Sequence, residues 1–253
     1  MTDFLSETRL SLTTITLNRP SRRNSISSAM FDGMAAELNR LAADDTVRAV
    51  CFKGSDQLFS AGADLDELLK SPKTLTEAMT RFFDALERFP KPLVAEVNGP
   101  CVGSAFIAVL YCDMVYASPK ALFSIPSVAL ARAPRFGACS LIVRAAGHAK
   151  AAEKILLSEP ISAQEALDMR LVTAVIDENE LSAAVLAKMA RLAVLPNGAV
   201  RAAKSVLTAS RRHILEAVRP FEEKVYDVQA ASAEAEEALK ACLEGRKPVF
   251  RPE

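Results

Sequence analysis

Apolar residues at helical spacing mark the first long element of the chain. After Ser27, an expected N-cap, Met30, Met34, Leu38 and Leu41 fall on one face of a helix. The spacing therefore predicts an amphipathic helix that packs this face against a core.

Short apolar runs that end near proline, asparagine or glycine predict strands in the first half of the chain. The runs are Leu10–Leu17, Val47–Phe52, Leu93–Val97, Asp113–Ala117 and Ala121–Phe123. Helical patterns lie between them, at residues 65–69, at about 75–88 and from about 103 onward. This alternation of strand and helix predicts right-handed crossovers and a layered α/β core.

The pattern becomes mostly helical beyond about residue 137. Helical spacing covers 141–157, 162–168, 180–194, 199–207 and 212–239, and one strand is predicted at 171–176. We expect residues 1–195 to form the α/β core and residues 196–253 to form a C-terminal helical segment. That segment either covers the core of its own chain or packs against a partner subunit.

Charge and composition exclude several classes of protein. The 31 Lys and Arg residues balance 31 Asp and Glu residues, so no net field draws the chain to nucleic acid or to anionic lipid. The longest mostly apolar stretch, Pro100–Cys112, is shorter than the about 20 residues that span a bilayer. We expect neither a nucleic-acid partner nor a membrane partner.

The cysteines and the N-terminal residues indicate the compartment. Five cysteines lie far apart without the spacing of a metal site, and we expect them to be buried thiols in a reducing environment. The N-terminal residues, which include Asp3 and Glu7, resemble neither a secretory signal nor an Arg-rich transit peptide. The expected location is therefore the cytoplasm.

Two loops of small residues each join an expected strand to an expected helix. One is Phe59–Leu65 and the other is Asn98–Ala105. Backbone amides at a helix N-terminus lack intrahelical partners and lie at the positive end of the helix dipole. Two such amides that point at one position would form an oxyanion hole. Each loop by itself is also typical of close packing.

Neither loop matches another glycine motif. The chain contains neither the GxxxxGK[ST] pattern of P-loop proteins nor the GxGxxG pattern of dinucleotide-binding folds. Gly103-Ser104 also lacks the GxSxG context of a serine hydrolase nucleophile. These patterns therefore give no prediction of nucleotide binding or of a serine nucleophile.

An ordered series of motifs extends over most of the chain. It comprises Leu17–Pro20, Phe59–Leu65, Pro92–Gly99, Cys112-Asp113, Gly147–Ala151 and Glu244–Phe250. This series resembles the crotonase superfamily, the family of enoyl-CoA hydratases and isomerases. Val97–Gly103 and Val115–Ser118 resemble its delta-3, delta-2 enoyl-CoA isomerase branch. The resemblance implies a layered β-β-α superhelix core with a C-terminal helical extension, assembled as a homotrimer or hexamer.

The resemblance also implies site residues, position by position. The amides of Ala63 and Ser104 would form the oxyanion hole for an acyl-CoA thioester. Ala61, Asp64 and Leu65 match the loop that contacts the adenine and pantetheine parts of coenzyme A. Coenzyme A would enter as part of the substrate, without a separate cofactor or a metal ion.

Three cations are candidates for the phosphates of coenzyme A. Arg22 and Arg23 follow the first expected strand, and Lys247 lies near the C-terminus. Cations of this kind pair with phosphate oxygens. A solvated surface position is the alternative for each of them.

The chain departs from the family at three positions that carry catalytic glutamates. Ile107 and Ser127 match the two glutamates of the hydratases, and Arg135 matches the glutamate of the isomerase branch. None of these side chains replaces a carboxylate in proton transfer, and loss of a general base costs about 10²–10⁴-fold in rate. Glu96, near the end of an expected strand, is either a relocated base or part of a structural ion pair.

Arg132 and Arg135 add a further possibility in the expected acyl pocket, to which Ile107 and Ser127 also belong. Two guanidinium groups could hold a substrate carboxylate, and some family members decarboxylate or hydrolyse carboxy-substituted acyl-CoA. Contact with phosphate or solvent is the alternative. We expect an acyl-CoA-binding enzyme of hydratase or isomerase type; the other hypotheses are an acyl-CoA decarboxylase or hydrolase and an acyl-CoA-binding protein without turnover.

Overall fold

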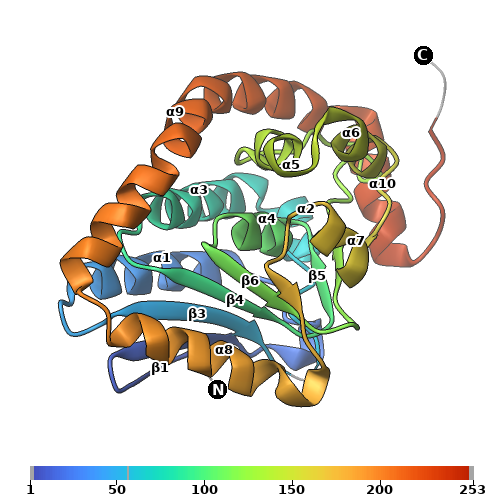
Figure 1. The fold of residues 1–253 in the computed structure, drawn as a ribbon. Coiled ribbons are helices and arrows are strands. Elements are labelled where there is room, and N and C mark those ends of the chain that lie inside the picture. Colours follow the sequence, from blue (N-terminus) through green and yellow to red (C-terminus); the bar gives the residue numbers. More distant parts are fainter. Residues whose placement is uncertain (1–2, 56, 251–253) are drawn as a thin grey trace.

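A six-stranded sheet forms the centre of the fold, with its strands in the order β1-β2-β3-β4-β6-β9 (Figure 1). The computed structural model describes residues 3–55 and 57–250. The strands are β1 (Phe4–Arg9), β2 (Leu12–Leu17), β3 (Ala49–Gly54), β4 (Leu93–Val97), β6 (Met114–Ala117) and β9 (Ala174–Val175). β1 and β2 form an antiparallel hairpin, and the other neighbouring strands pair in parallel.

A smaller second sheet follows the carboxyl end of β4. Its strands are β5 (Pro100–Val102), β7 (Leu122–Ser124) and β8 (Ile161–Ser162), in that order. β5 pairs with β7 in parallel, and β7 pairs with β8 in antiparallel orientation. The chain therefore passes from one sheet to the other through Asn98-Gly99.

Helices cover both faces of the larger sheet (Figure 1). α1 (Ser28–Ala43) and α3 (Pro72–Arg88) lie on one face, and α8 (Glu178–Ala193) lies on the other. The Ser27 side chain accepts a hydrogen bond from the Met30 amide, so the expected N-cap of α1 is confirmed. The observed architecture is the α/β fold that the sequence predicts.

Strand β3 shows why its sequence is a continuous apolar run. Val50 and Phe52 belong to the main core, whereas Ala49 and Cys51 pack in a separate cluster that includes residues of α8. Successive side chains of a strand point to opposite faces, so a strand that is covered on both faces has no polar alternation.

The remaining helices surround the second sheet and the C-terminal half. They are α2 (Leu65–Lys70), α4 (Ser104–Leu110), α5 (Ala138–Ala146), α6 (His148–Leu156), α7 (Ala163–Asp168), α9 (Asn197–Ala230) and α10 (Ala233–Glu244). In Figure 1, α9 runs along the outside of the molecule, and α10 packs against α2. In the described ranges no single helix has the length and apolar composition of a membrane span; α8 and α9 reach it only together, across a bend of 110°.

Several contacts attach α9 to the core. The Lys204 ammonium lies 2.7 Å from the Asp113 carboxylate. Leu215 is fully buried against Gly137. Further along, Arg219 pairs with acidic residues of α3. The expected division between residues 195 and 196 falls just before α9 and stays a prediction, and residues 251–253 of the expected C-terminal segment lie outside the described residues.

Three expected helix boundaries are wrong. Residues 141–157 do not form one helix, because Gly147, with φ +79°, separates α5 from α6. The predicted helices 199–207 and 212–239 are not separated at residues 208–211, because α9 continues through them and through Pro220 to Ala230. The last part of 212–239 instead belongs to α10, which begins at Ala233. Within this polar stretch of α9, the Thr208 hydroxyl donates a hydrogen bond to the Lys204 carbonyl one turn earlier in the helix. The helix ends before Ser232, whose side chain caps α10.

The first strand and one of the cysteine assignments also differ from expectation. β1 was not predicted because its residues are mostly exposed and polar, and Leu10 and Ser11 form the turn to β2 with positive φ. Cys51 and Cys101 are buried, and burial raises the pKa of both thiols. Cys242 is exposed, so the expectation that all five cysteines are buried is wrong.

Candidate functional site

Backbone hydrogen bonds hold the two glycine-containing loops side by side. The Ser60 amide donates to the Pro100 carbonyl at 3.1 Å, and the Val102 amide donates to the Ser60 carbonyl at 2.9 Å. The Ser60 hydroxyl donates to the Asn24 carbonyl and accepts from the Gly62 amide, which fixes the first loop internally. The loop after β3 therefore meets the start of α4 across β5.

Gly62 allows the closest approach of these loops. Its φ is +87°, a region that favours glycine. A Cβ atom at this position would lie 2.6 Å from the Val102 carbonyl oxygen and 3.4 Å from the Ser104 nitrogen. Any side chain here would push the second loop away from the first.

The amides of Ala63 and Ser104 are left free by the local hydrogen bonding. Ile26 donates to the Gly62 carbonyl and accepts from the Asp64 amide, so the Ala63 N–H between these two bonds points to the opposite side. Ser104 is the first residue of α4 and follows Gly103, whose φ is +58°. Within residues 3–55 and 57–250, neither amide has a hydrogen-bond acceptor.

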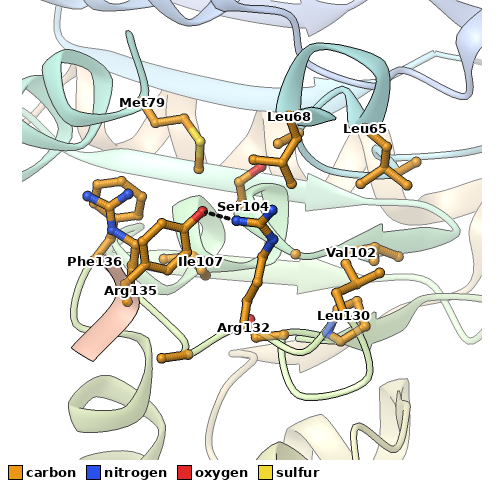
Figure 2. A pocket seen from close by; sticks show the side chains of 17 residues that line it. Leu65, Leu68, Met79, Val102, Ser104, Ile107, Leu130, Arg132, Arg135 and Phe136 are labelled. Atoms are coloured by element: carbon orange, nitrogen blue, oxygen red, sulfur yellow. Dashed lines mark hydrogen bonds between the residues drawn. The ribbon is translucent and has the colours of Figure 1, made fainter. Parts of the chain in front are cut away.

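Both residues line one cavity of about 110 Å³ (Figure 2). The cavity brings together eight of the residues singled out from the sequence: Ala61, Ala63, Leu65, Ser104, Ile107, Ser127, Arg132 and Arg135. Apolar side chains such as Leu68, Met79 and Phe136 complete most of the wall. No aspartate or glutamate of the described chain lines it.

Two arginines and a tyrosine form the polar part of the wall. Arg132 donates to the Tyr226 hydroxyl at 2.9 Å, the bond drawn in Figure 2. The guanidinium carbon of Arg135 lies 4.3 Å from the centre of the Tyr226 ring. Arg132, Tyr226 and Leu68 also line a neighbouring cavity of about 550 Å³ between α2, α3, α9 and α10, so these three residues lie between the two spaces.

Ser104 also places its side chain at the cavity. The residue is 5% exposed, and its hydroxyl oxygen has no hydrogen-bond partner in the described part of the chain. Ser127 lines the same cavity together with Ile107. The polar groups available for chemistry are therefore amides, hydroxyls and guanidinium groups.

Asp64 performs a structural task beside the cavity. Its carboxylate accepts from the Asp66 and Glu67 amides at the start of α2 and pairs with Arg19 at 2.7 Å. Burial acts to raise the pKa of this carboxyl, but the bonds from Arg19 and the two amides outweigh it, so the pKa is lowered. Contact of Asp64 with coenzyme A stays a prediction.

The three candidate cations for the coenzyme A phosphates are exposed and do not line the cavity. Arg22 pairs with Asp66 at 3.0 Å. Arg23 has a left-handed backbone, and its carbonyl accepts from the Ala61 amide. Lys247 follows the end of α10. The structure shows no shared site for them, and their role stays a prediction.

Glu96 is not placed to act as a relocated base. Its carboxylate accepts a hydrogen bond from the Ser182 hydroxyl of α8, on the face of the sheet that α8 covers. Glu96 does not line the cavity.

Glu222 of α9 is a second acid near the cavity, but it does not line it. Its carboxylate accepts a hydrogen bond from the Gly137 amide at 2.8 Å. Burial raises the pKa of this carboxyl.

Tyr226 is a polar residue of the cavity wall that the sequence did not indicate. It lies on α9, far along the chain from both loops, in a stretch of mixed polar and apolar residues. Its contact with Arg132 spans 94 positions of sequence. No local pattern identifies such a partner, because the contact depends on how α9 packs.

Comparisons with known proteins bear on this arrangement. Residues 7–253 match the family described as Enoyl-CoA hydratase/isomerase. The 2,3-dehydroadipyl-CoA hydratase of Escherichia coli K12 is 32% identical over 242 residues, which cover 94% of each chain. Enoyl-CoA delta isomerase 2 of Rattus norvegicus is 34% identical over 218 residues, which cover 83% of this chain and 56% of the relative.

Solved structures show the same architecture. An enoyl-CoA hydratase/isomerase from Pseudoalteromonas atlantica T6c has a TM-score of 0.92 and 30% identity, over 99% of this chain and 100% of its own. The layered sheets and helical C-terminal region are those of the crotonase-type enzymes that act on acyl-CoA. The chain belongs to the enoyl-CoA hydratase/isomerase family.

Proposed function

We propose that this enzyme binds an acyl-CoA thioester and holds the thioester oxygen between the amides of Ala63 and Ser104. The observation that carries the proposal is the pair of backbone N–H groups without acceptors at one cavity. Negative charge that develops on a thioester oxygen in the enolate would be stabilised by two such donors. Reactions of the hydratase and isomerase type pass through that enolate.

The described part of the cavity wall lacks the carboxylates that hydratase and isomerase reactions use for proton transfer. Hydration and double-bond migration both need a group that moves a proton, and no carboxylate of the described residues lines the cavity. We expect turnover about 10²–10⁴-fold below that of an enzyme with its glutamates in place. An acyl-CoA-binding protein without turnover is the second candidate, favoured by the same observation.

The coenzyme A part of the substrate accounts for the remaining candidate residues. In this proposal Ala61 and Leu65 contact the pantetheine arm beside the cavity, with Asp64 behind them. The phosphates of coenzyme A lie at the protein surface, where they contact the exposed side chains of Arg22, Arg23 and Lys247. Coenzyme A enters as part of the thioester, no separate cofactor takes part, and the proposed location is the cytoplasm.

We also propose assembly into a homotrimer or hexamer through the C-terminal helices. Large apolar side chains of α9 are exposed in the single chain, including Val206, Leu207, Phe221 and Val228. Such a set is typical of a surface that a partner covers. Light scattering should give a mass of three or six chains, and a monomer at micromolar concentration would contradict this part.

A single substitution tests the role of the Ser104 amide. Ser104→Pro removes the N–H at the first position of α4, where proline is tolerated in helices. We expect turnover of 2-enoyl-CoA or 3-enoyl-CoA to fall by about 10²–10³-fold. Ser104→Ala, which keeps the amide, separates loss of the N–H from loss of the hydroxyl.

Calorimetry with acyl-CoA thioesters completes the test. Binding together with slow turnover that Ser104→Pro abolishes supports the enzyme, and binding without turnover supports the second candidate. Turnover that is equal in Ser104→Pro and Ser104→Ala would count against the proposed oxyanion hole.

A further inference from the structure

Arg135 is a buried cation with unused donors. The residue is 8% exposed, and none of its side-chain N–H groups has an acceptor in the described part of the chain. The Nε atom of Arg132 is likewise buried without a partner, and this side chain makes one hydrogen bond, to Tyr226. No ion pair joins either arginine to an acid of the described residues.

Aromatic stacking leaves these donors free. The guanidinium carbon of Arg135 lies 4.3 Å from the centre of the Tyr226 ring and 4.8 Å from that of Phe136. Stacking engages the face of the guanidinium plane, whereas its five N–H groups point outward in that plane. The two rings therefore hold the group in place with its hydrogen-bonding edge available.

Among the described residues, no carboxylate forms an ion pair with Arg135. Glu222 is close enough for its charge to interact with Arg135, but its carboxylate accepts a hydrogen bond from the Gly137 amide instead. An arginine stays protonated even when buried, and a buried charge without a counter-ion is costly. A site of this kind is completed by an anionic ligand.

The position of the arginines defines which anion fits. They share one small cavity with the free amides of Ala63 and Ser104, where the proposed function places the thioester. The phosphates of coenzyme A are separated from the thioester by the long pantetheine arm and do not reach this cavity. The anion therefore belongs to the acyl group, and a planar carboxylate matches the paired N–H donors of a guanidinium group.

We propose that Arg135 and Arg132 bind a carboxylate at the far end of the acyl chain, so that the substrate is the monothioester of a dicarboxylic acid. The inference rests on the proposed acyl-CoA function. Ion pairing to guanidinium groups stabilises a carboxylate relative to neutral carbon dioxide and so opposes its loss. The carboxylate is a recognition group that the product retains, not a leaving group.

Binding measurements with pairs of saturated thioesters test the proposal. Calorimetry would compare glutaryl-CoA with pentanoyl-CoA and adipyl-CoA with hexanoyl-CoA, because each pair has the same number of acyl carbons. In at least one of the two pairs, we expect the thioester that carries the carboxylate to bind at least tenfold more tightly than the one that lacks it. Arg135→Gln should bring the two affinities within each pair to within threefold of one another, and Arg132→Gln should reduce the preference.

Controls separate this inference from the proposed function. Arg144→Gln removes an exposed cation of α5 and should leave the preference unchanged. Equal affinity within both pairs, or a preference that survives both arginine substitutions, would overturn the carboxylate site while the acyl-CoA function stands. Failure of every thioester to bind would overturn both. Release of carbon dioxide from malonyl-CoA that depends on Arg135 would show that the carboxylate is lost, and would refute its role as a retained group.

Discussion

Single positions decide what chemistry this cavity supports. Ile107 and Ser127, which the resemblance matches to the glutamates of hydratases, line the cavity together with the free amides of Ala63 and Ser104. In the proposed site, the part that binds the thioester oxygen is therefore separate from the part that would transfer protons. The first is built from backbone, which sequence change alters little, and the second depends on side chains.

Restoring both acids should create the missing activity. We expect Ile107→Glu with Ser127→Glu to raise 2-enoyl-CoA hydration by about 100-fold, because a positioned acid or base contributes about 10²–10⁴-fold. The loss of absorbance of the conjugated thioester measures the rate. The double substitution to Gln keeps size and polarity but cannot exchange protons. Equal rates in the Glu and Gln variants would contradict the prediction.

Residues of the site could be predicted from sequence where their placement is local. Ala63 and Ser104 belong to small-residue loops between a strand and a helix, and the structure places both loops at one cavity. Tyr226 could not be predicted, because its position depends on long-range packing of α9 through Leu215 and Arg219.

Among the elements, α2 depends most on a single side chain. This helix has only six residues, and Asp64 both caps it and joins it to Arg19. Short helices have little intrinsic stability in water, so the cap and tertiary contacts hold this one. Leu65 and Leu68 of α2 line the cavity, so unwinding of α2 after loss of the cap would displace part of the cavity wall.

Asp64→Ala should destabilise the fold by about 2 kcal/mol, from loss of the cap and of a mostly buried ion pair. The folded-state pKa of Asp64 is lowered, so its contribution is complete above the ordinary pKa of about 3.9 and is lost as pH falls through the lower folded value. Urea unfolding of wild type and Asp64→Asn across this acid range measures it.

The control for this prediction is Asp45→Ala, which removes a carboxylate whose side chain is 88% exposed. Its effect should stay within about 0.5 kcal/mol. If Asp64→Ala is no more destabilising than Asp45→Ala, the capping role assigned to Asp64 is incorrect.

The elements themselves were predictable where periodicity is strong. α1 and β4 follow their apolar patterns because one or both of their faces are buried. β1 escaped prediction because it is an exposed edge strand that buries no regular face. The continuous helix α9 was not predicted, because its middle is polar and contains Pro220 and its helical form depends on tertiary contacts.

At the scale of the whole molecule, α9 connects distant parts of the chain. Arg219 lies 2.7 Å from Asp84 and 3.1 Å from Glu87 on α3, and its side chain is 20% exposed. Burial raises the pKa of Glu87, and the positive charge of Arg219 opposes that rise. The ion pairs lie two helical turns before Tyr226 and fix the part of α9 that reaches the cavity.

Arg219→Gln should lower the free energy of unfolding by about 2 kcal/mol, because two partly buried acids lose their cation. The amides of α9 should also exchange hydrogen faster than those of α1, since the helix is held less firmly. Chemical denaturation and hydrogen exchange measure the two effects. Arg212→Gln removes an exposed arginine of the same helix and should change neither; equal effects of both variants would refute the attachment.

The place of Tyr226 on α9 has a consequence for the order in which the site forms. Both glycine loops are complete once about half of the chain has been synthesised, yet Tyr226, which completes the wall, is supplied by a helix near the C-terminal end. A growing chain can therefore pair its sheets and expose both free amides before it has a closed binding space. Ligand binding reports that synthesis and folding of the C-terminal region are finished, and the long separation in sequence makes this closure a late step in folding.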